Sequence, residues 1–186
     1  MENLLQSIAA LQTRLAEAGF PSAVIGGIAV GVWGDPRVTR DADLKVLARR
    51  DQAGTLWETL GPDYTAMVAK PLDSLRRMGF VFVQDCHGTR LDLLLADTPY
   101  DEAVIQRGRA MEIQPGITLR VCSAEDLVIY KMISSRPRDR ADVEGIVRRQ
   151  GQALDDDYIL GWLRQFEPAL DDSTLVAEYT RLRKLI

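Results

Sequence analysis

Hydrophobic and polar residues recur along the chain with two different periods, and each period predicts one kind of element. Near the start, a helical period predicts an amphipathic helix that ends near Ala18, with apolar residues at Leu4, Leu5, Ile8, Leu11 and Leu15. Residues 23–25 are typical of a short strand, and residues 27–33 predict a short helix that Gly34-Asp35-Pro36 stops. Between Asp41 and Leu47, charged and apolar residues alternate, which predicts a second strand with two different faces.

The middle of the chain predicts further strands, and its last third predicts helices. Two pairs of β-rich segments joined by polar turns predict hairpins, 80–84 with 89–96 and 111–113 with 117–121. Helices are predicted at 51–60, 71–78, 99–108, 123–134, 137–149, 155–166 and 173–185. Ser123 and Asp126 form a capping-box pattern with Asp in place of Glu. The expected fold class is α/β (α+β): a short mixed sheet flanked by helices in residues 1–122, with a helical region, residues 123–186, packed on it as one compact unit.

The composition fits one domain, or one domain with a small appendage, and narrows the function classes. Of 186 residues, 46% are hydrophobic and 27% are charged, and the net charge is −4. No apolar run approaches the ~18 residues that a membrane span needs. The N-terminus resembles neither a signal peptide nor a transit peptide. We therefore expect a cytoplasmic protein with no membrane partner. The acidic balance argues against a general nucleic-acid binder, although Arg136, Arg138 and Arg140 are candidates for a local contact with RNA.

The two cysteines, Cys86 and Cys122, lie far apart in strand-like sequence. We expect both to be small buried hydrophobes in a reducing compartment, not partners in a disulfide. Neither belongs to a CxxC pattern and the chain has one histidine, so neither a Cys/His zinc site nor an Asp-His-Ser hydrolase is expected. No GxxxxGK[ST] or GxGxxG pattern occurs, so P-loop and Rossmann chemistry have no support.

Two acids in the second predicted strand are the first candidates for chemistry. Asp41 and Asp43 stand two positions apart, so both carboxylates leave the sheet on one face, close enough to share a divalent cation. The Gly26-Gly27 pair follows the first strand and opens a helix. Glycines there let a ligand approach the backbone closely, and a helix N-terminus favours anions. An anion cradle beside paired carboxylates is typical of a site for a nucleoside triphosphate with magnesium.

A third acid, Asp92, lies in the second strand of the first predicted hairpin, which is expected to run beside the strand of Asp41 and Asp43. Its neighbours Leu91 and Leu93 point to the opposite face. A carboxylate in such an apolar strand is costly to bury unless it is paired, hydrogen-bonded or metal-bound. Three carboxylates from two strands would hold one or two Mg²⁺ (or Mn²⁺) ions, and Asp92 could instead take the proton from an acceptor hydroxyl.

Three sequence blocks together resemble the minimal nucleotidyltransferase superfamily, which has the polymerase-β-like fold. The blocks are GGIAVGVWGDPRVTRDADLKV, RLDLLLAD and SAEDLVIYKMISSRPRDRADVEGI, and the resemblance covers Val24 to about Ile146. They are similar to a bacterial branch that includes the toxins of abortive-infection toxin–antitoxin pairs. The resemblance implies a nucleotidyltransferase-like fold and Mg²⁺-dependent transfer of a nucleoside monophosphate from a nucleoside triphosphate to an acceptor hydroxyl.

The resemblance also implies a role for each candidate residue. The implied catalytic and metal-binding residues are Asp41, Asp43 and Asp92, the nucleotide-binding residues are Gly26, Gly27, Arg40 and Lys131, and the supporting residues are Asp139 and Asp142. The two supporting acids are three positions apart on one predicted helix and would brace the neighbouring loop or orient Lys131. Many members carry Gly-Ser at the turn, with the serine hydroxyl on a phosphate. Gly27 departs from that pattern and leaves the contact to backbone amides.

Each feature also has a simpler structural interpretation. The glycine pair could be only a tight turn, the two strand acids a solvated edge, Lys131 a surface lysine, and Asp139 and Asp142 acids that stabilise a helix N-terminus. For the whole chain, the alternative function is a catalytically degenerate fold that binds a nucleotide or a partner protein. A metal-dependent phosphoesterase is the third. The acceptor stays open between an RNA end, a protein side chain and a small molecule, and a cognate antitoxin is a candidate partner.

Overall fold

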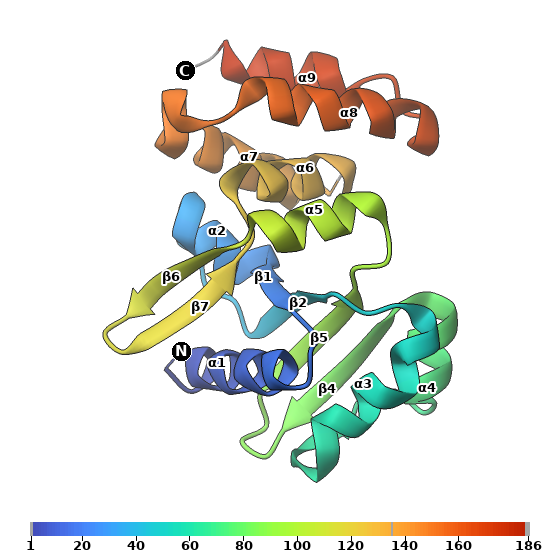
Figure 1. Ribbon diagram of the computed structural model, residues 1–186. Coiled ribbons are helices and arrows are strands. Elements are labelled where there is room, and N and C mark those ends of the chain that lie inside the picture. The colour runs from blue at the N-terminus through green and yellow to red at the C-terminus, as the bar shows by residue number, and fades with distance from the viewer. Residues whose placement is uncertain (1, 135, 185–186) are drawn as a thin grey trace. The chain divides into compact units, whose positions relative to one another are not determined.

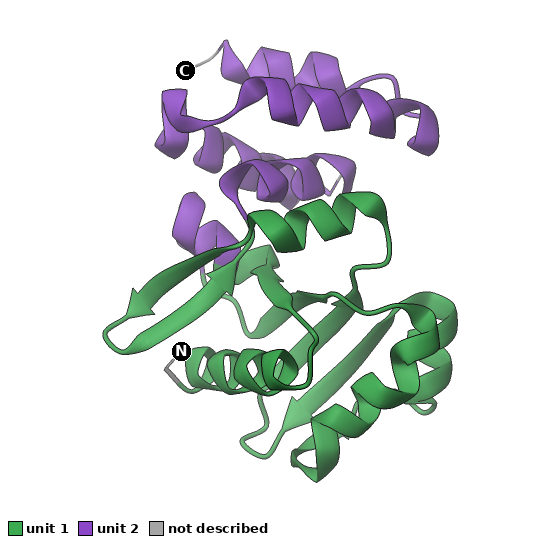
Figure 2. Cartoon of the chain, viewed as in Figure 1, with its two compact units in different colours: residues 1–28, 38–122 green, residues 29–37, 123–186 purple. Residues whose placement is uncertain are grey.

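The computed structural model describes residues 2–134 and 136–184, and these residues fall into two compact units. Unit 1 comprises residues 1–28 and 38–122, and unit 2 comprises residues 29–37 and 123–186 (Figure 2). The sequence suggested a simple boundary at residue 122. The structure instead groups residues 29–37 with the C-terminal helices, so helix α2 (Gly26–Trp33) begins in unit 1 and ends in unit 2.

Unit 1 is built on a mixed sheet, as the sequence predicted (Figure 1). Its strands are β1 Ser22–Ile25, β2 Asp41–Val46, β3 Tyr64–Ala66, β4 Phe80–Asp85, β5 Arg90–Leu95, β6 Arg109–Gln114 and β7 Ile117–Val121. They lie in the order β3-β4-β5-β2-β1-β7-β6. Both predicted hairpins are confirmed, because β4 pairs with β5 and β6 pairs with β7 in antiparallel fashion. β2 and β5 are parallel neighbours, and this pairing brings the two acidic segments together.

The central strands have one apolar face and one charged face. On β2, Ala42 and Leu44 are fully buried, whereas Asp41 and Asp43 between them are half-buried. A period-2 pattern of this kind fixes the register, because a slip by one residue would turn the acids into the core. Burial of a side chain such as Leu44 contributes roughly 1.5–3 kcal/mol.

Helices complete unit 1. They are α1 Glu2–Glu17, α3 Ala53–Leu60, α4 Pro71–Asp73 and α5 Pro99–Arg107, with short 3₁₀ turns at Arg50–Gln52 and Gly61–Asp63. The amphipathic helix predicted near the start is confirmed as α1, which packs against β1, β2 and β7. The helix predicted at 71–78 continues after α4 as a π-helical turn, Ser74–Met78. It ends at Gly79, whose φ of 75° is left-handed and suits glycine.

Unit 2 is helical. Besides the end of α2, it contains α6 Ala124–Ser134, α7 Pro137–Gln150, α8 Asp156–Leu170 and α9 Leu175–Arg183. The serine cap predicted at the start of α6 is confirmed, because the Asp126 amide donates to Ser123 Oγ at 3.1 Å. The Asp126 carboxylate accepts from the Ser123 hydroxyl at 2.7 Å. The predicted last helix, 173–185, ended at a residue outside the described part of the chain.

The environments of the two cysteines and the lengths of the helices were also predicted from the sequence. Neither cysteine forms a disulfide, and Cys122 is buried as expected, but the prediction that Cys86 is buried is wrong. Cys86 is exposed because it sits in the turn between β4 and β5, beyond the last residue of β4. Across residues 2–134 and 136–184, no helix combines the length and apolar character needed to cross a membrane.

Candidate active site

The three candidate catalytic acids of unit 1 come from two adjacent parallel strands. Asp43 on β2 is in register with Asp92 on β5, and Asp41 is in register with Arg90. Register partners on neighbouring strands point to the same face and lie about 4.8 Å apart. Asp41 and Asp43 share that face because they are two positions apart. The parallel pairing therefore gathers all three carboxylates on one side of the sheet.

The glycine turn lies against this acidic face. Gly26 has a φ of 64°, and a Cβ atom built on it would lie 1.9 Å from Asp43 Oδ2. Only glycine fits there, both for its backbone conformation and for its space. From the sequence, we expected a ligand to lie close to the backbone at this glycine. In the structure, the Asp43 carboxylate lies there. The turn that starts α2 is thus packed directly on a candidate metal ligand.

The second glycine is also in close contact with a polar side chain. A Cβ atom on Gly27 would lie 2.9 Å from Thr39 Oγ1 and 3.0 Å from Thr39 Cβ. Thr39 Oγ1 in turn donates to Asp41 Oδ1 at 3.0 Å. Sequence reasoning missed Thr39, since nothing in a loop residue's neighbours along the chain reveals that it faces a distant turn. The hydroxyl that Gly27 lacks is present here on Thr39.

Asp92 is held by an arginine that sequence reasoning also missed. Arg90 Nε donates to Asp92 Oδ1 at 2.7 Å, and Arg90 Nη2 donates to Asp92 Oδ2 at 2.8 Å. Asp92 is buried, with 7% of its surface exposed. The cost of burying this carboxylate is therefore offset by a bidentate ion pair. The signal was available in the sequence, because Arg90 is two positions before Asp92 in a strand and so shares its face.

The donor set suits a hard divalent cation, but Arg90 uses both oxygens of Asp92. Mg²⁺ and Mn²⁺ prefer carboxylate oxygens, and Asp41, Asp43 and Asp92 supply them from one face. Among the described residues, no group of three or more His, Cys, Asp or Glu side chains comes together in a way that could hold a metal ion. The residue types and register thus fit a metal, provided that Asp92 exchanges its arginine for the ion.

A second cluster of buried acids lies within unit 2. Lys131 Nζ on α6 is 2.5 Å from Asp139 Oδ1 and 2.9 Å from Asp142 Oδ2, both on α7. Arg37 binds the Asp142 carboxylate in bidentate fashion at 3.0 and 3.1 Å. Ser134 also donates to Asp139. Asp139 and Asp142 therefore both contact Lys131 directly, whereas Arg37 had no signal in the sequence. That these two acids support a nucleotide-binding lysine stays a prediction.

The charges of this cluster are matched by buried ion pairs. Burial alone raises the pKa of Asp142, but hydrogen bonds from Arg37 and Lys131 outweigh it and lower the pKa below its usual value. The simpler interpretation of Lys131 as a surface lysine is wrong, because only 11% of its side chain is exposed. Whether Lys131 binds a nucleotide stays a prediction.

The end of α7 fastens the segment that leads into β2. The Arg149 guanidinium donates to the Gly34 carbonyl at 2.6 Å, and the Gln150 amide donates to the Trp33 carbonyl at 2.7 Å. Arg148 pairs with Asp35. Together with the Arg37–Asp142 pair, these contacts fix residues 33–37 within unit 2. The charged residues along α7 therefore have a structural use, because several of them anchor this loop.

The remaining predicted basic residues lie at the surface. Arg40 is exposed directly before Asp41, and Arg136 and Arg138 are exposed at the start of α7. Arg140 pairs with Glu178 on α9 at 3.1 Å. Nucleotide binding by Arg40 and RNA contact by the α7 arginines stay predictions.

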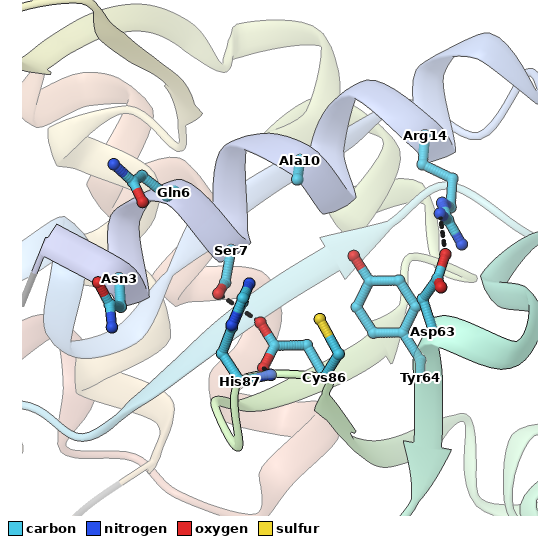
Figure 3. A pocket seen from close by; sticks show the side chains of 10 residues that line it. Asn3, Gln6, Ser7, Ala10, Arg14, Asp63, Tyr64, Cys86 and His87 are labelled. Carbon is cyan, nitrogen blue, oxygen red and sulfur yellow. Dashed lines mark hydrogen bonds and ion pairs between the residues drawn. The ribbon is translucent and has the colours of Figure 1, made fainter.

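A cavity of about 340 Å³ in unit 1 has none of the three candidate catalytic acids in its lining. Figure 3 shows the side chains that line it. It lies between the polar face of α1 and the neighbouring ends of β3 and β4. Ser7 donates to Asp85 there, and Arg14 pairs with Asp63 at 2.5 Å. Asp85 also accepts the backbone amides of His87 and Thr89. Asp85 thus caps the β4–β5 turn, and the Arg14–Asp63 pair ties α1 to the start of β3, so both pairs have a structural use.

Comparison with known proteins supports the fold. No protein-family model and no curated protein sequence matches the chain. Among solved structures, an antigenic nucleotidyltransferase-like protein from Paracoccidioides brasiliensis matches with a TM-score of 0.53 and 18% identity over 95% of this chain and 93% of that chain. The antibiotic-resistance factor ANT(2'')-Ia matches with a TM-score of 0.57 and 17% identity over 91% of this chain and 94% of that chain.

A third solved structure points the same way. The lincomycin-bound lincosamide antibiotic adenylyltransferase LnuA matches with a TM-score of 0.52 and 14% identity, over 78% of this chain and 96% of that chain. Identities this low speak for the fold alone. The resemblance seen in the three sequence blocks is thus confirmed at the level of the fold: the chain has the nucleotidyltransferase fold.

Proposed function

We propose that the chain is a divalent-metal-dependent nucleotidyltransferase, which transfers a nucleoside monophosphate from a nucleoside triphosphate to an acceptor hydroxyl and releases pyrophosphate. The register of β2 and β5 carries the proposal, since it sets Asp43 beside Asp92 with Asp41 on the same face. The nucleotidyltransferase fold supports the same activity. Phosphoryl-type transfer needs positioned charge more than covalent chemistry, and three carboxylates on one face of the sheet are suited to hold it.

The three acids divide the work at the reacting centre. Asp41 and Asp43 hold Mg²⁺ or Mn²⁺, with Thr39 orienting Asp41 through its hydroxyl. Asp92 is either the third ligand or the base that accepts the proton of the acceptor hydroxyl. A divalent cation bound here would neutralise charge on the phosphates as the bond to pyrophosphate breaks.

The nucleotide-binding residues surround the same acids or belong to unit 2. The backbone at Gly26 and Gly27 offers the amides of the α2 N-terminus to phosphate oxygens. Thr39 adds a hydroxyl at the position that Gly27 leaves without one. Arg40 is exposed and can meet an anion. In unit 2, Lys131 is proposed as the lysine for the triphosphate, with Asp139 and Asp142 as its supports.

Two classes of acceptor come first. ANT(2'')-Ia is described as an antibiotic-resistance factor and LnuA as a lincosamide antibiotic adenylyltransferase, which makes a small hydroxylated molecule the first class to test. The sequence blocks resemble toxin nucleotidyltransferases, which makes an RNA end or a protein side chain the second. In that second case the protein would be a toxin held inactive by a cognate antitoxin.

Pyrophosphate release tests the proposed function. Each of the four ribonucleoside triphosphates, labelled in the α-phosphate, is incubated with Mg²⁺ and in turn with total RNA, total protein or a small-molecule extract. The wild type runs beside the double variant Asp41→Ala, Asp43→Ala. The expected result is pyrophosphate release in the wild type only, with the α-phosphate label transferred to one acceptor class.

The other outcomes discriminate the alternatives. Nucleotide binding without release of pyrophosphate in any extract would favour the catalytically degenerate binding module. Consumption of the nucleotide with no label on any acceptor would favour a phosphoesterase. Equal release by the wild type and the double variant would remove the carboxylates from the mechanism and refute the proposal.

A further inference from the structure

The ion pair between Arg90 and Asp92 occupies positions on the carboxylate that a metal ion could use. Arg90 takes both carboxylate oxygens of Asp92, at 2.7 and 2.8 Å. This bidentate pair fills one lone pair on each oxygen, which are the two positions that a cation chelating both oxygens would need, and it leaves the outer lone pair of each oxygen open. A cation at an outer position would be repelled by the nearby guanidinium charge, so a chelating metal ion and Arg90 are alternatives at Asp92.

The guanidinium is held over the site by an aromatic ring. Its central carbon lies 4.7 Å from the ring centre of Phe82, and Phe82 is the register partner of Asp92 on β4. A stacked guanidinium keeps its edge available for hydrogen bonds while its face is covered. About 41% of the Arg90 side chain is exposed, so it can leave Asp92 by rotation of its own bonds, with no change in the backbone.

The charges of the other two acids also act on Arg90. Besides Asp92, both Asp41 and Asp43 attract its guanidinium electrostatically. Arg90 is in register with Asp41 across β2 and β5. Its positive charge therefore lies within the field of all three carboxylates, where the divalent cation of the proposed mechanism would also lie.

We propose, on the basis of the proposed function, that Arg90 is a positioning residue that serves as the internal counter-ion of the carboxylate site and competes with the divalent cation for Asp92. In the metal-free protein, Arg90 holds Asp92 in place and limits repulsion among the acids. A metal ion chelates Asp92 only in the fraction of molecules in which Arg90 has released it, which lowers the apparent metal affinity by that fraction. A bound triphosphate offers the released guanidinium a new anionic partner, so nucleotide and metal strengthen each other's binding.

Binding of Mn²⁺ in the absence of nucleotide tests the proposal without any assay of turnover. Free Mn²⁺ is counted by electron paramagnetic resonance for the wild type and for Arg90→Gln. If Arg90 holds Asp92 about nine-tenths of the time, the variant should bind Mn²⁺ about tenfold more tightly than the wild type. Addition of a non-hydrolysable nucleoside triphosphate should tighten Mn²⁺ binding more in the wild type than in the variant.

The chain offers a matched control in the same unit. Arg14 also pairs with an aspartate, Asp63, and also lies over an aromatic ring, that of Tyr64 at 5.3 Å. Arg14→Gln removes the same kind of charge from an ion pair that contains none of the three candidate metal ligands, so Mn²⁺ affinity should stay at the wild-type value. Arg90→Lys keeps the positive charge but cannot bind both carboxylate oxygens in the bidentate way of a guanidinium. Its Mn²⁺ affinity should therefore fall between those of the wild type and Arg90→Gln.

The outcomes separate this proposal from the proposed function. Equal or weaker Mn²⁺ binding in Arg90→Gln, with folded protein by circular dichroism and saturable binding in the wild type, would overturn the role of Arg90 and leave the nucleotidyltransferase proposal standing. If Arg90→Gln does not fold, Arg90→Lys decides on the same criterion. No saturable Mn²⁺ binding in the wild type or either variant, with or without nucleotide, would refute both.

Discussion

Two groups of aspartates in this protein differ in the charges that surround them. In unit 2, Lys131 and Arg37 together contact Asp139 and Asp142, so two cations meet two carboxylates. In unit 1, Asp41, Asp43 and Asp92 share one face of the sheet, where Arg90 binds Asp92 and the neutral Thr39 hydroxyl donates to Asp41. The first group joins two acids of α7 to two cations, whereas the second sets three like-charged side chains side by side on two strands.

The difference separates a structural use of buried charge from a chemical one. A balanced and fully hydrogen-bonded cluster fixes geometry, and loss of one partner leaves the others buried and uncompensated. A group of like charges costs stability and persists where a positive ligand completes it. The α7 cluster therefore should act as an anchor for residues 33–37, and the acidic face of β2 and β5 should act as the reacting centre.

The largest expected effect is on the anchor. Asp142→Asn leaves Lys131 and Arg37 facing a neutral side chain, and we expect it to lower the free energy of unfolding by about 3 kcal/mol. Urea denaturation followed by circular dichroism measures this loss. Asp157→Asn, an exposed acid in the first turn of α8, is the control and should cost less than about 1 kcal/mol. A loss for Asp142→Asn no greater than the control would mean that the cluster does not hold unit 2 together.

The second effect concerns the turn that packs on Asp43. Gly26→Ala places a methyl group 1.9 Å from Asp43 Oδ2 and forces a non-glycine residue to a φ of 64°. We expect a loss of about 2 kcal/mol in unfolding free energy, because the backbone strain adds to the displacement of Asp43. Thermal and urea unfolding would measure it.

Gly31→Ala in the same helix is the matched control for that substitution. Nothing lies within 4 Å of a Cβ atom built on Gly31, and its backbone is helical. Alanine is the better helix former, so this variant should gain roughly 0.5–1 kcal/mol. Equal effects of the two substitutions would show that Asp43 does not constrain the turn.

The sequence predicted the elements better than the partners of each side chain. The period of two along β2 placed Asp41 and Asp43 on one face, and the capping box at Ser123 located the start of α6. Local patterns of this kind are written within a few residues. The Arg37–Asp142 pair spans 105 positions, and the approach of Asp43 to Gly26 depends on how β1 and β2 pair, so neither has a local signal.

The Arg90–Asp92 pair lies between these two cases, because its residues are close in the sequence but their contact was not predicted. The position of Arg90 two residues before Asp92 placed it on the same face of the strand, and a bidentate pair was foreseeable from that rule. The prediction that Cys86 is buried was wrong for a related reason. The hairpin was predicted, but its turn residue was expected to be as buried as the strands on either side. Pattern reasoning finds the element first and the environment of each residue only where a period continues through it.

The third effect is a pH dependence of the anchor. The pKa of Asp142 is lowered in the folded protein, so its contribution to stability is present above the unfolded pKa of about 3.9 and is lost as the pH falls through the folded value. Arg37→Gln removes one source of the lowering. We expect it to cost about 1.5 kcal/mol at pH 7 and to move the onset of acid unfolding to higher pH. Urea midpoints between pH 3 and pH 7 measure both changes, and an unchanged acid limb would contradict this.

The smallest expected change in stability is for a substitution on the acidic face of β2 and β5. This substitution distinguishes most directly between the two groups of acids. Asp43→Asn removes one of three like charges from the acidic face and keeps the shape of the side chain. The relief of repulsion offsets the contacts that are lost, so the free energy of unfolding should change by less than about 0.5 kcal/mol, against about 3 kcal/mol for the same change at Asp142. Release of pyrophosphate should nonetheless fall below detection, because Asp43 is a proposed metal ligand. If Asp43→Asn instead destabilises the fold as much as Asp142→Asn, then both groups of acids are anchors, and the chemistry must lie elsewhere.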